Sequence, residues 1–424
     1  MLFRSNRALR ALGAPGFETQ MLVWLSARID GPRLRAALAR VQQAEPVLAS
    51  HLAAGRFADR HWQASDRAVP LLIEADLPSA EPEQALTHAA RILSTPRDLH
   101  ATSPVEFHLL HSPDGRDLVL MHYNHTALDN NAAVLLMRRI DRVFAGDAPT
   151  AVADKGDAIL HYLRRFARAR RRQAARATID AWRRWQRGGI VLLGRRDANR
   201  PRQLELRVVT RTIDADASAA LQAHTLRVCG LPSLSMALLG SAFRAIAGQA
   251  SEQRARNAGF CAGIGVDLGL RGPDGPIFHN LMSLVPIHAA WADLDDRDTL
   301  LRALSRQFRE RLAADMDLGV LQLATLFSRR PRYAEWALDI FFRHSFSLWY
   351  GYFGSLDSLG STWCGVPIED AFFIGPSWPP MGLTLLANQF RGRLRLQATY
   401  VSHSVSDAAA SAFLHALVSD LARR

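Results

Sequence analysis

The chain has 424 residues, of which 48% are hydrophobic and 22% are charged. These values are ordinary for a globular protein and exclude a collagen-like, coiled-coil or largely disordered chain. The length is about three times that of a typical domain, so we expect two domains of comparable size. The formal net charge is +12, and Lys155 is the only lysine among the 52 Lys and Arg residues. Such a surface attracts nucleic acid, acidic proteins, phosphates or an anionic membrane, and the charge does not choose among them.

The cysteines and the hydrophobic stretches indicate in which cellular compartment the protein is expected. Cys229, Cys261 and Cys364 lie far apart, without the spacing of a zinc site or a disulfide framework, so we expect buried thiols and no metal. Residues 1–17 contain no apolar stretch long enough for a signal peptide. No later run approaches the roughly 18 apolar residues of a membrane span. The expected compartment is the cytoplasm.

The first part of the chain alternates strand and helix patterns. A strand is predicted at residues 21–25 and a turn with a helix start at 30–32, and Leu34, Leu38 and Val41 form the buried stripe of that helix. The next predicted elements are a strand at residues 69–73, a helix at 83–93, a strand at 105–110 and a hairpin turn at 112–115.

Residues 118–140 carry the strongest chemical signal. A strand-like run passes through a polar corner at residues 124–130 into a pattern of helical period. His125 and Asp129 lie four residues apart at this corner, where the imidazole can face a cavity and the carboxylate can serve as a helix cap or charge partner. His125 is therefore the best candidate for a general base, and a hydrogen-bonded structural histidine is the alternative. The histidines without a comparable context include His122, His279, His344 and His403.

Residues 159–189 differ in kind, because they are dense in arginine and carry aromatic residues at Tyr162, Phe166, Trp182 and Trp185. They predict one long helix that joins two halves of the chain. A solvated connecting helix is the simplest interpretation. A nucleic-acid arm, a basic membrane-surface helix and a docking surface for an acidic carrier protein stay open.

The second half of the chain repeats the mixture of strand and helix patterns seen in the first half. The predicted elements are strands at residues 204–209, 260–270, 278–286, 345–353, 383–387 and 394–400, and helices at 218–224, 236–246, 299–314 and 407–421.

With these elements in order, the chain resembles the condensation-domain superfamily of acyltransferases, which includes chloramphenicol acetyltransferase. The family signature HHxxxDG corresponds here to residues 124–130, NHTALDN. Weaker matches follow in the family's order at residues 34–48, 266–271, 278–286 and 379–400. The resemblance implies a mixed α/β fold of two chloramphenicol-acetyltransferase-like lobes, packed as a V around a central tunnel.

The resemblance also implies roles for single residues. His125 would act in the tunnel as the general base, and Asp129 would form a structural ion pair with Arg271. A buried bidentate partner of this kind offsets the cost of burying a carboxylate. Asn280 is a candidate for clamping the loop that bridges the lobes, and a hydrogen bond at a strand edge is the alternative for it. Ser347, Tyr350 and Ser355 are candidates for the tunnel wall or for donors to the oxyanion, and core positions are the alternative for them.

Two positions depart from the signature. Asn124 replaces the first histidine, and an Asn amide can also form hydrogen bonds that support the loop. Asn130 replaces the glycine, and Asn is the residue that best imitates the conformational freedom of glycine. Members of this family with altered signatures include non-catalytic recruitment modules, which is the alternative function.

The resulting expectation is a stand-alone acyltransferase that joins a thioester-bound acyl group to a hydroxyl or amine in secondary-metabolite or lipid assembly. The donor would be an acyl carrier protein with its phosphopantetheine arm, or coenzyme A, and no cofactor would be bound permanently. We expect a monomer without a nucleic-acid partner, and peripheral membrane contact through the Arg-rich stretch stays open. The expected division is an N-terminal lobe at residues 1–155, a connector at 156–200 and a C-terminal lobe at 201–424.

Overall fold

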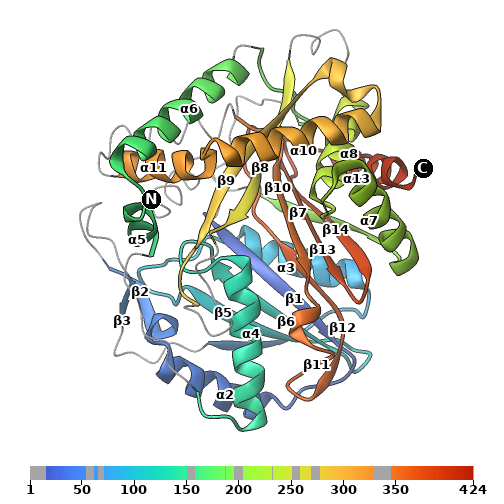
Figure 1. Cartoon of the computed structure of the whole chain (residues 1–424). Helices are drawn as coiled ribbons and strands as arrows, with labels where there is room; N and C mark the ends of the chain where they lie inside the picture. Colours follow the sequence, from blue (N-terminus) through green and yellow to red (C-terminus); the bar gives the residue numbers. More distant parts are fainter. Residues whose placement is uncertain are drawn as a thin grey trace.

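The structure is a computed structural model of the chain (Figure 1). It describes residues 16–53, 62–64, 71–149, 158–186, 188–194, 204–231, 233–250, 258–268, 277–328 and 345–423. Their strands form sheets of six, four, two and two strands with helices packed against them, so the predicted mixed α/β class is confirmed. None of the helices within these residues is both long and apolar enough to cross a bilayer.

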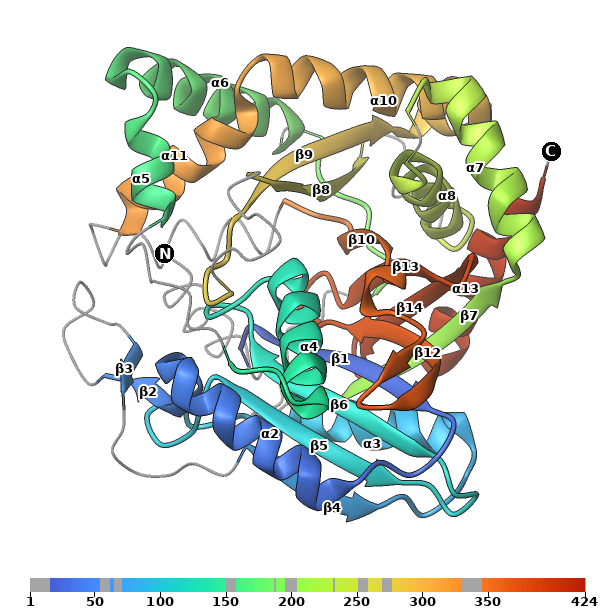
Figure 2. The same cartoon turned by 60° about the horizontal axis from the view of Figure 1, so that its bottom comes forward.

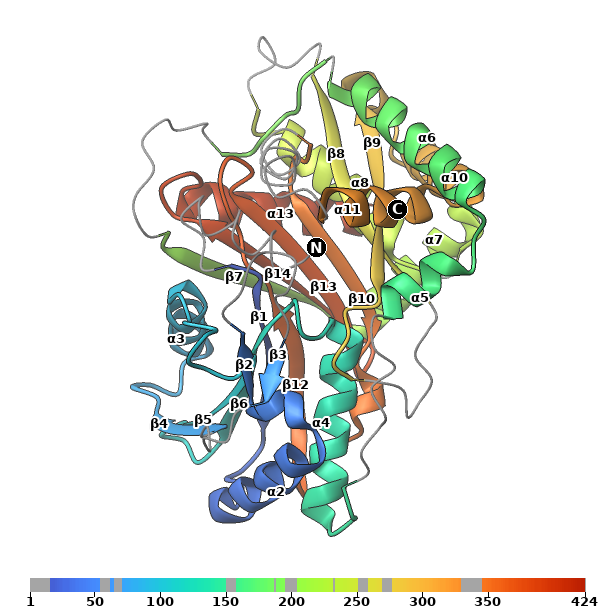
Figure 3. The same ribbon diagram turned by 90° about the vertical axis from the view of Figure 1, so that its left-hand side faces the viewer.

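The first sheet has the strand order β11-β12-β1-β6-β5-β4. Its strands are β1 (Glu18–Leu25), β4 (Leu72–Asp76), β5 (Val105–His111), β6 (Asp117–Asn124), β11 (Thr362–Trp363) and β12 (Val366–Ile374). Only β4 and β5 pair in parallel. Strand β12 comes from near the C-terminal end and pairs with β1, so distant parts of the sequence build this sheet together (Figure 3). The lobe boundaries near residues 155 and 200 remain predictions.

Different helices pack on the two faces of this sheet. Met21 and Val23 of β1 lie in one apolar cluster with residues of α2 (Gly31–Ala44) and α4 (Asn130–Ala145). Leu22 and Trp24 of the same strand lie in a second apolar cluster with residues of α3 (Pro82–Ser94). Successive side chains of a strand point to opposite faces, so α2 and α4 cover one face and α3 the other.

Local sequence signals set the ends of these helices. Asp30 caps α2 by accepting a 2.9 Å hydrogen bond from the main-chain N–H of Arg33. The predicted stripe of α2 is confirmed, since Leu34, Leu38 and Val41 are buried. The end of α4 is set by Gly146, whose φ of 117° is a left-handed conformation that favours glycine.

The second sheet has the order β10-β13-β14-β7. Its strands are β7 (Leu206–Ile213), β10 (Trp349–Ser355), β13 (Leu383–Phe390) and β14 (Arg393–Val401). Helices α7 (Ala215–Cys229), α8 (Ser235–Ala247) and α13 (Asp407–Ala422) share its large apolar core. The side-chain amide of Asn388 on β13 donates to the Ala371 carbonyl of β12 at 2.9 Å and connects the two sheets.

A long hairpin of β8 (Gly259–Asp267) and β9 (Met282–Ala290) lies beside the second sheet. Helix α10 (Arg297–Ala313) packs on this hairpin and on α8, and α11 (Met316–Ser328) continues from it (Figure 1). The short elements are η1 (Pro46–Ala49), β2 (Ser50–Leu52), β3 (Trp62–Ala64), η2 (Trp291–Leu294) and η3 (Asp357–Leu359).

The Arg-rich stretch is two helices, so the prediction of one long helix was wrong. Helix α5 (Ala158–Arg164) ends before α6 (Arg168–Gln186) begins. At the break, the N–H groups of Arg165 and Phe166 bond to carbonyls three residues back, and the ring of Phe166 folds against Tyr162 with centroids 5.2 Å apart. This aromatic contact is made across the end of α5, which the charge pattern alone does not reveal.

Helix α6 crosses α11 very closely (Figure 1). A Cβ placed on Gly319 of α11 would overlap the Thr178 hydroxyl and the Ala174 carbonyl of α6. Glycine at position 319 therefore permits the contact that fixes α6 on the second half of the chain.

Candidate active site

The corner between β6 and α4 is held by main-chain bonds. The N–H of His125 donates to the Phe17 carbonyl at 2.6 Å, and the N–H of Ala127 donates to the Asn124 carbonyl at 2.9 Å. Figure 2 shows this corner at the end of α4 that faces the β8 and β9 hairpin. The strand, loop and helix predicted at residues 118–140 are confirmed.

The ring of His125 has a defined proton arrangement. Its Nδ1 lies 2.8 Å from the Leu128 carbonyl oxygen. A carbonyl only accepts, so Nδ1 carries the proton and Nε2 keeps a lone pair when the ring is neutral. The side chain is half-buried. Burial lowers the pKa of His125 from its ordinary value of 6.5, while the Leu128 carbonyl and the Asp129 charge oppose this shift. Nε2 is thus available as a base at neutral pH.

Asp129 stabilises the backbone around this histidine. Its Oδ1 accepts a hydrogen bond of 2.9 Å from the N–H of Ala132, which caps α4, and its Oδ2 accepts one of 2.9 Å from the N–H of Leu281. Both oxygens therefore bind main-chain N–H groups. The predicted partner Arg271 lies outside the described residues, so that ion pair stays a prediction.

Asn280 reaches the same corner from the segment before β9. Its amide donates to the main-chain carbonyl of His125 at 3.0 Å, and its oxygen accepts from the N–H of Met282 at 3.3 Å. The structure thus brings Asn280 together with His125 and Asp129. The segment at residues 280–281 makes two separate bonds to the corner.

The two positions that depart from the family signature both have hydrogen-bond partners. Asn124 donates to Glu18 Oε1 at 2.7 Å and accepts from the Thr126 N–H at 3.1 Å. Asn130 accepts from the hydroxyl of Tyr123 at 2.6 Å. The non-glycine residues with positive φ in the described part of the chain are Asp315, Cys364 and Arg391, so Asn130 needs no unusual backbone conformation. What Asn130 adds at this position is side-chain volume.

The three residues predicted for the tunnel wall or the oxyanion form hydrogen bonds with residues in the second half of the chain. Ser347 is buried, and its hydroxyl accepts from the Cys261 N–H at 3.2 Å. Tyr350 is buried in the core of the second sheet, and its hydroxyl donates to the Ser235 carbonyl at 2.9 Å. Ser355 is exposed, and its hydroxyl accepts from the Asp357 N–H at 3.0 Å. None of the described hydrogen bonds links these three residues to His125.

Sequence reasoning missed the groups that orient the corner. The Leu128 and Phe17 carbonyls are main-chain atoms and have no sequence signature. Glu18 has a weak one, because it is an acidic residue at the start of an apolar strand. The antiparallel register places it opposite Asn124, which no local pattern could predict.

No protein-family model matches this chain, and no curated protein matches its sequence. Solved structures do resemble it. The first condensation domain of the CDA synthetase has a TM-score of 0.74 at 15% identity, over 99% of this chain and 93% of that one. The trichothecene 15-O-acetyltransferase TRI3 from Fusarium sporotrichioides has a TM-score of 0.71 at 13% identity, over 99% and 93%.

The starter condensation domain of rhizomide synthetase RzmA, an R148A mutant in complex with C8-CoA, has a TM-score of 0.70 at 15% identity over 98% of this chain and 91% of that one. All three identities are low, and the likenesses extend over nearly the whole of each chain. The chain therefore has the fold of the condensation domains and related acyltransferases.

Proposed function

We propose that the protein is an acyltransferase that condenses a thioester-bound acyl group with a hydroxyl or amine acceptor, with His125 as the general base. The observation that carries this proposal is the hydrogen bond from His125 Nδ1 to the Leu128 carbonyl. It leaves the Nε2 lone pair to accept a proton. The fold supports the same reaction class, because condensation domains and an acetyltransferase share it.

The proposed reaction is a direct transfer. Nε2 of His125 accepts the proton of the acceptor as its oxygen or nitrogen attacks the carbonyl carbon of the thioester. The tetrahedral oxyanion then collapses, the carbon–sulfur bond breaks, and the proton passes from Nε2 to the leaving thiolate. The products are an ester or amide and a free thiol, without a covalent acyl-enzyme. No metal or redox cofactor takes part in these steps.

Asp129 and Asn280 serve this reaction as positioning residues. Asp129 binds two main-chain N–H groups and Asn280 binds the carbonyl of the catalytic residue itself. A base must lie within hydrogen-bond reach of the proton it removes, so a loop held from both sides favours transfer. In this proposal the reacting groups meet in a tunnel between two lobes.

The donor is either the phosphopantetheine arm of an acyl carrier protein or coenzyme A. Exposed arginines on α5 and α6, including Arg164, Arg168, Arg172 and Arg176, give an acidic carrier a surface of opposite charge. The RzmA domain in complex with C8-CoA makes medium-chain acyl-coenzyme A a sensible first donor to test.

The test is a matrix of acyl-coenzyme A and acyl-carrier donors against alcohol and amine acceptors, with product detected by mass spectrometry and released thiol by a colorimetric reagent. We expect turnover by the wild type and a loss of about 10²–10⁴-fold in His125→Ala. His415→Ala changes an exposed histidine of α13 and should keep full activity. Full activity in His125→Ala would refute the proposed base.

A second candidate function is a recruitment module without catalysis. It is favoured by Asn130, whose buried side chain stands where the family signature has glycine. Saturable binding of a carrier protein, with no product from any donor and with no change in His125→Ala, would support the module. Product formation by the wild type would exclude it.

A further inference from the structure

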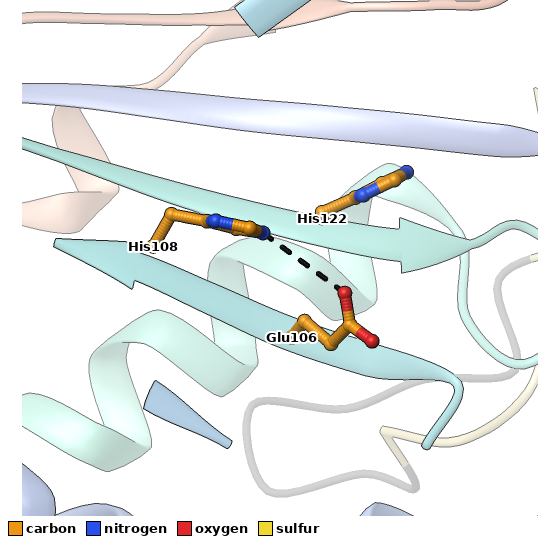
Figure 4. Close-up of side chains that lie close together, drawn as sticks. All are labelled: Glu106, His108 and His122. Carbon is orange, nitrogen blue, oxygen red and sulfur yellow. Dashed lines mark ion pairs between the residues drawn. The ribbon is translucent and has the colours of Figure 1, made fainter. Parts of the chain in front are cut away.

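A buried polar cluster lies on the face of the first sheet that α3 covers, away from the chemistry of His125. Antiparallel register places Glu106 of β5 directly opposite His122 of β6. His108 lies two residues after Glu106, so all three side chains point to the same face. Figure 4 shows the three side chains close together on the two adjacent strands, with a dashed line between Glu106 and His108.

The cluster has the geometry of a three-ligand site. One oxygen or nitrogen atom from each residue lies within 4.8 Å of the others, and Nε2 of His108 lies 3.9 Å from Oε2 of Glu106. Ligands of a tetrahedral ion with bonds of about 2.0–2.1 Å stand about 3.3 Å apart, so small side-chain rotations would close the site. Both histidines are buried, and His122 is only 1% exposed.

The imidazoles lack the hydrogen bonds that their burial requires. Within the described part of the chain, neither ring nitrogen of His122 has a hydrogen-bond partner, and Nε2 of His108 has none. Nε2 of His122 lies 3.5 Å from Oε2 of Glu18 without forming a hydrogen bond. An unsatisfied buried polar atom costs about 1–3 kcal/mol. A single ligand bound between the rings would satisfy one nitrogen of His122 and Nε2 of His108, which are two of these three atoms.

Burial also keeps these rings neutral. Desolvation, followed by the nearby Arg97 charge, lowers the pKa of His108 to about 4 and that of His122 well below its ordinary value. Neutral imidazole is the form that binds a metal through a nitrogen lone pair.

The charged side chains around the cluster favour the binding of a cation. Arg97 is buried and forms an ion pair of 2.8 Å with Glu18 and a longer one of 3.5 Å with Glu106. One guanidinium thus faces two carboxylates. The two carboxylates and the guanidinium carry formal charges that sum to −1, and Glu106 is half-buried. A cation beside them would therefore meet a favourable charge.

We propose that Glu106, His108 and His122 bind one zinc ion. Two imidazoles and a carboxylate form a ligand set that zinc favours, whereas magnesium and calcium prefer oxygen ligands alone. The sequence did not predict this site, because strand pairing and not a local motif brings the three ligands together. The ion would fasten β5 to β6 three residues before His125, and its role would be structural.

The test uses the full chain without a polyhistidine tag, stripped with EDTA and dialysed free of chelator. Titration with Co²⁺ should produce the visible bands of a tetrahedral site at one equivalent per chain, and Zn²⁺ should displace them. Zinc should also raise the melting temperature, because it binds the folded state. Neither readout requires catalysis, so the zinc site and the acyltransferase proposal can fail separately.

Three conservative variants are compared with one control. His108→Gln, His122→Gln and Glu106→Gln should each weaken zinc binding by at least about a hundredfold, since even changes outside the ligand shell cost 10–100-fold. His415→Gln, on exposed α13, should bind like the wild type. Far-ultraviolet circular dichroism identifies any variant that fails to fold.

The wild-type titration decides the proposal even if every variant unfolds. Absence of a one-to-one Co²⁺ or Zn²⁺ complex at micromolar protein overturns it. Equal binding by folded His122→Gln and by the wild type overturns it as well, because the metal would then lie elsewhere.

Discussion

The side-chain amide of Asn280 donates a 3.0 Å hydrogen bond to the main-chain carbonyl of His125, 155 residues earlier in the chain. It is a direct link from the segment before β9 to the corner that carries the proposed base. A neighbouring link runs from the Leu281 N–H to Asp129. The position of His125 therefore depends on both halves of the chain.

Asn280→Ala should lower kcat about fivefold to tenfold and change KM less. The lost hydrogen bond is worth about 1 kcal/mol, which corresponds to a factor of this size if it acts on the placement of the base. Steady-state kinetics on a hydroxyl acceptor measure the two constants. Asn280→Asp should be at least as damaging, because it replaces the donor by a carboxylate facing a carbonyl. Unchanged kcat in both variants would show that the bond does not position His125.

The pH profile should follow the titration of His125. Burial disfavours the imidazolium, so the pKa of His125 lies below 6.5 and the base is already free at neutral pH. We expect kcat/KM to rise with pH to a midpoint below 6.5 and to stay level through pH 8. An alcohol acceptor is needed, because an amine would add its own titration. A midpoint above 6.5 would contradict the neutral, desolvated histidine.

Asp129→Ala should destabilise the protein by about 2–4 kcal/mol. The change removes the cap of α4, worth about 0.5–2 kcal/mol, and leaves the buried Leu281 N–H unsatisfied at a cost of about 1–3 kcal/mol. Denaturant unfolding followed by circular dichroism measures the loss. Asp129→Asn should lose less, since an Asn oxygen can still cap the helix. Equal stability of the wild type and Asp129→Ala would exclude the capping role.

Gly319→Ala should destabilise the protein although alanine favours helices. The new Cβ would meet main-chain atoms of α6 at Ala174, which cannot move aside as a flexible side chain can. Overpacking typically lowers the free energy of unfolding by about 1–3 kcal/mol, whereas the higher helix propensity of alanine raises it by at most about 1 kcal/mol. Gly248→Ala is the matched control, because its nearest neighbour would be 3.6 Å from the new Cβ. Thermal unfolding should separate the two variants clearly.

The sequence predicted the elements with strong periodicity. The corner at His125, the helix after Asp30 and the late strands β13 and β14 are confirmed, because their apolar patterns and turn residues are local. Strand β12 and helix α11 were not predicted. The run of β12, VPIEDAFFI, contains a proline and two adjacent acids. The run of α11, MDLGVLQLATLFS, is apolar on nearly every side and lacks a clear period.

Long-range pairing explains what was missed around the candidate site. The meeting of His122 with Glu106 and that of Asn124 with Glu18 depend on strand register, which the sequence specifies only through the whole sheet. The proton arrangement of His125 depends on a carbonyl, which every residue has. Residue types could therefore identify the base but not the groups that orient it.

The pairing of β12 with β1 has a consequence for synthesis and folding. Every residue of β1 is buried, and without β12 its outer edge would present unpaired main-chain groups along an apolar strand. During translation, the first sheet cannot be completed until residue 374 has left the ribosome. A fragment that ends near residue 155 should therefore aggregate or bind chaperones, and supplying residues 362–374 in trans should improve its solubility.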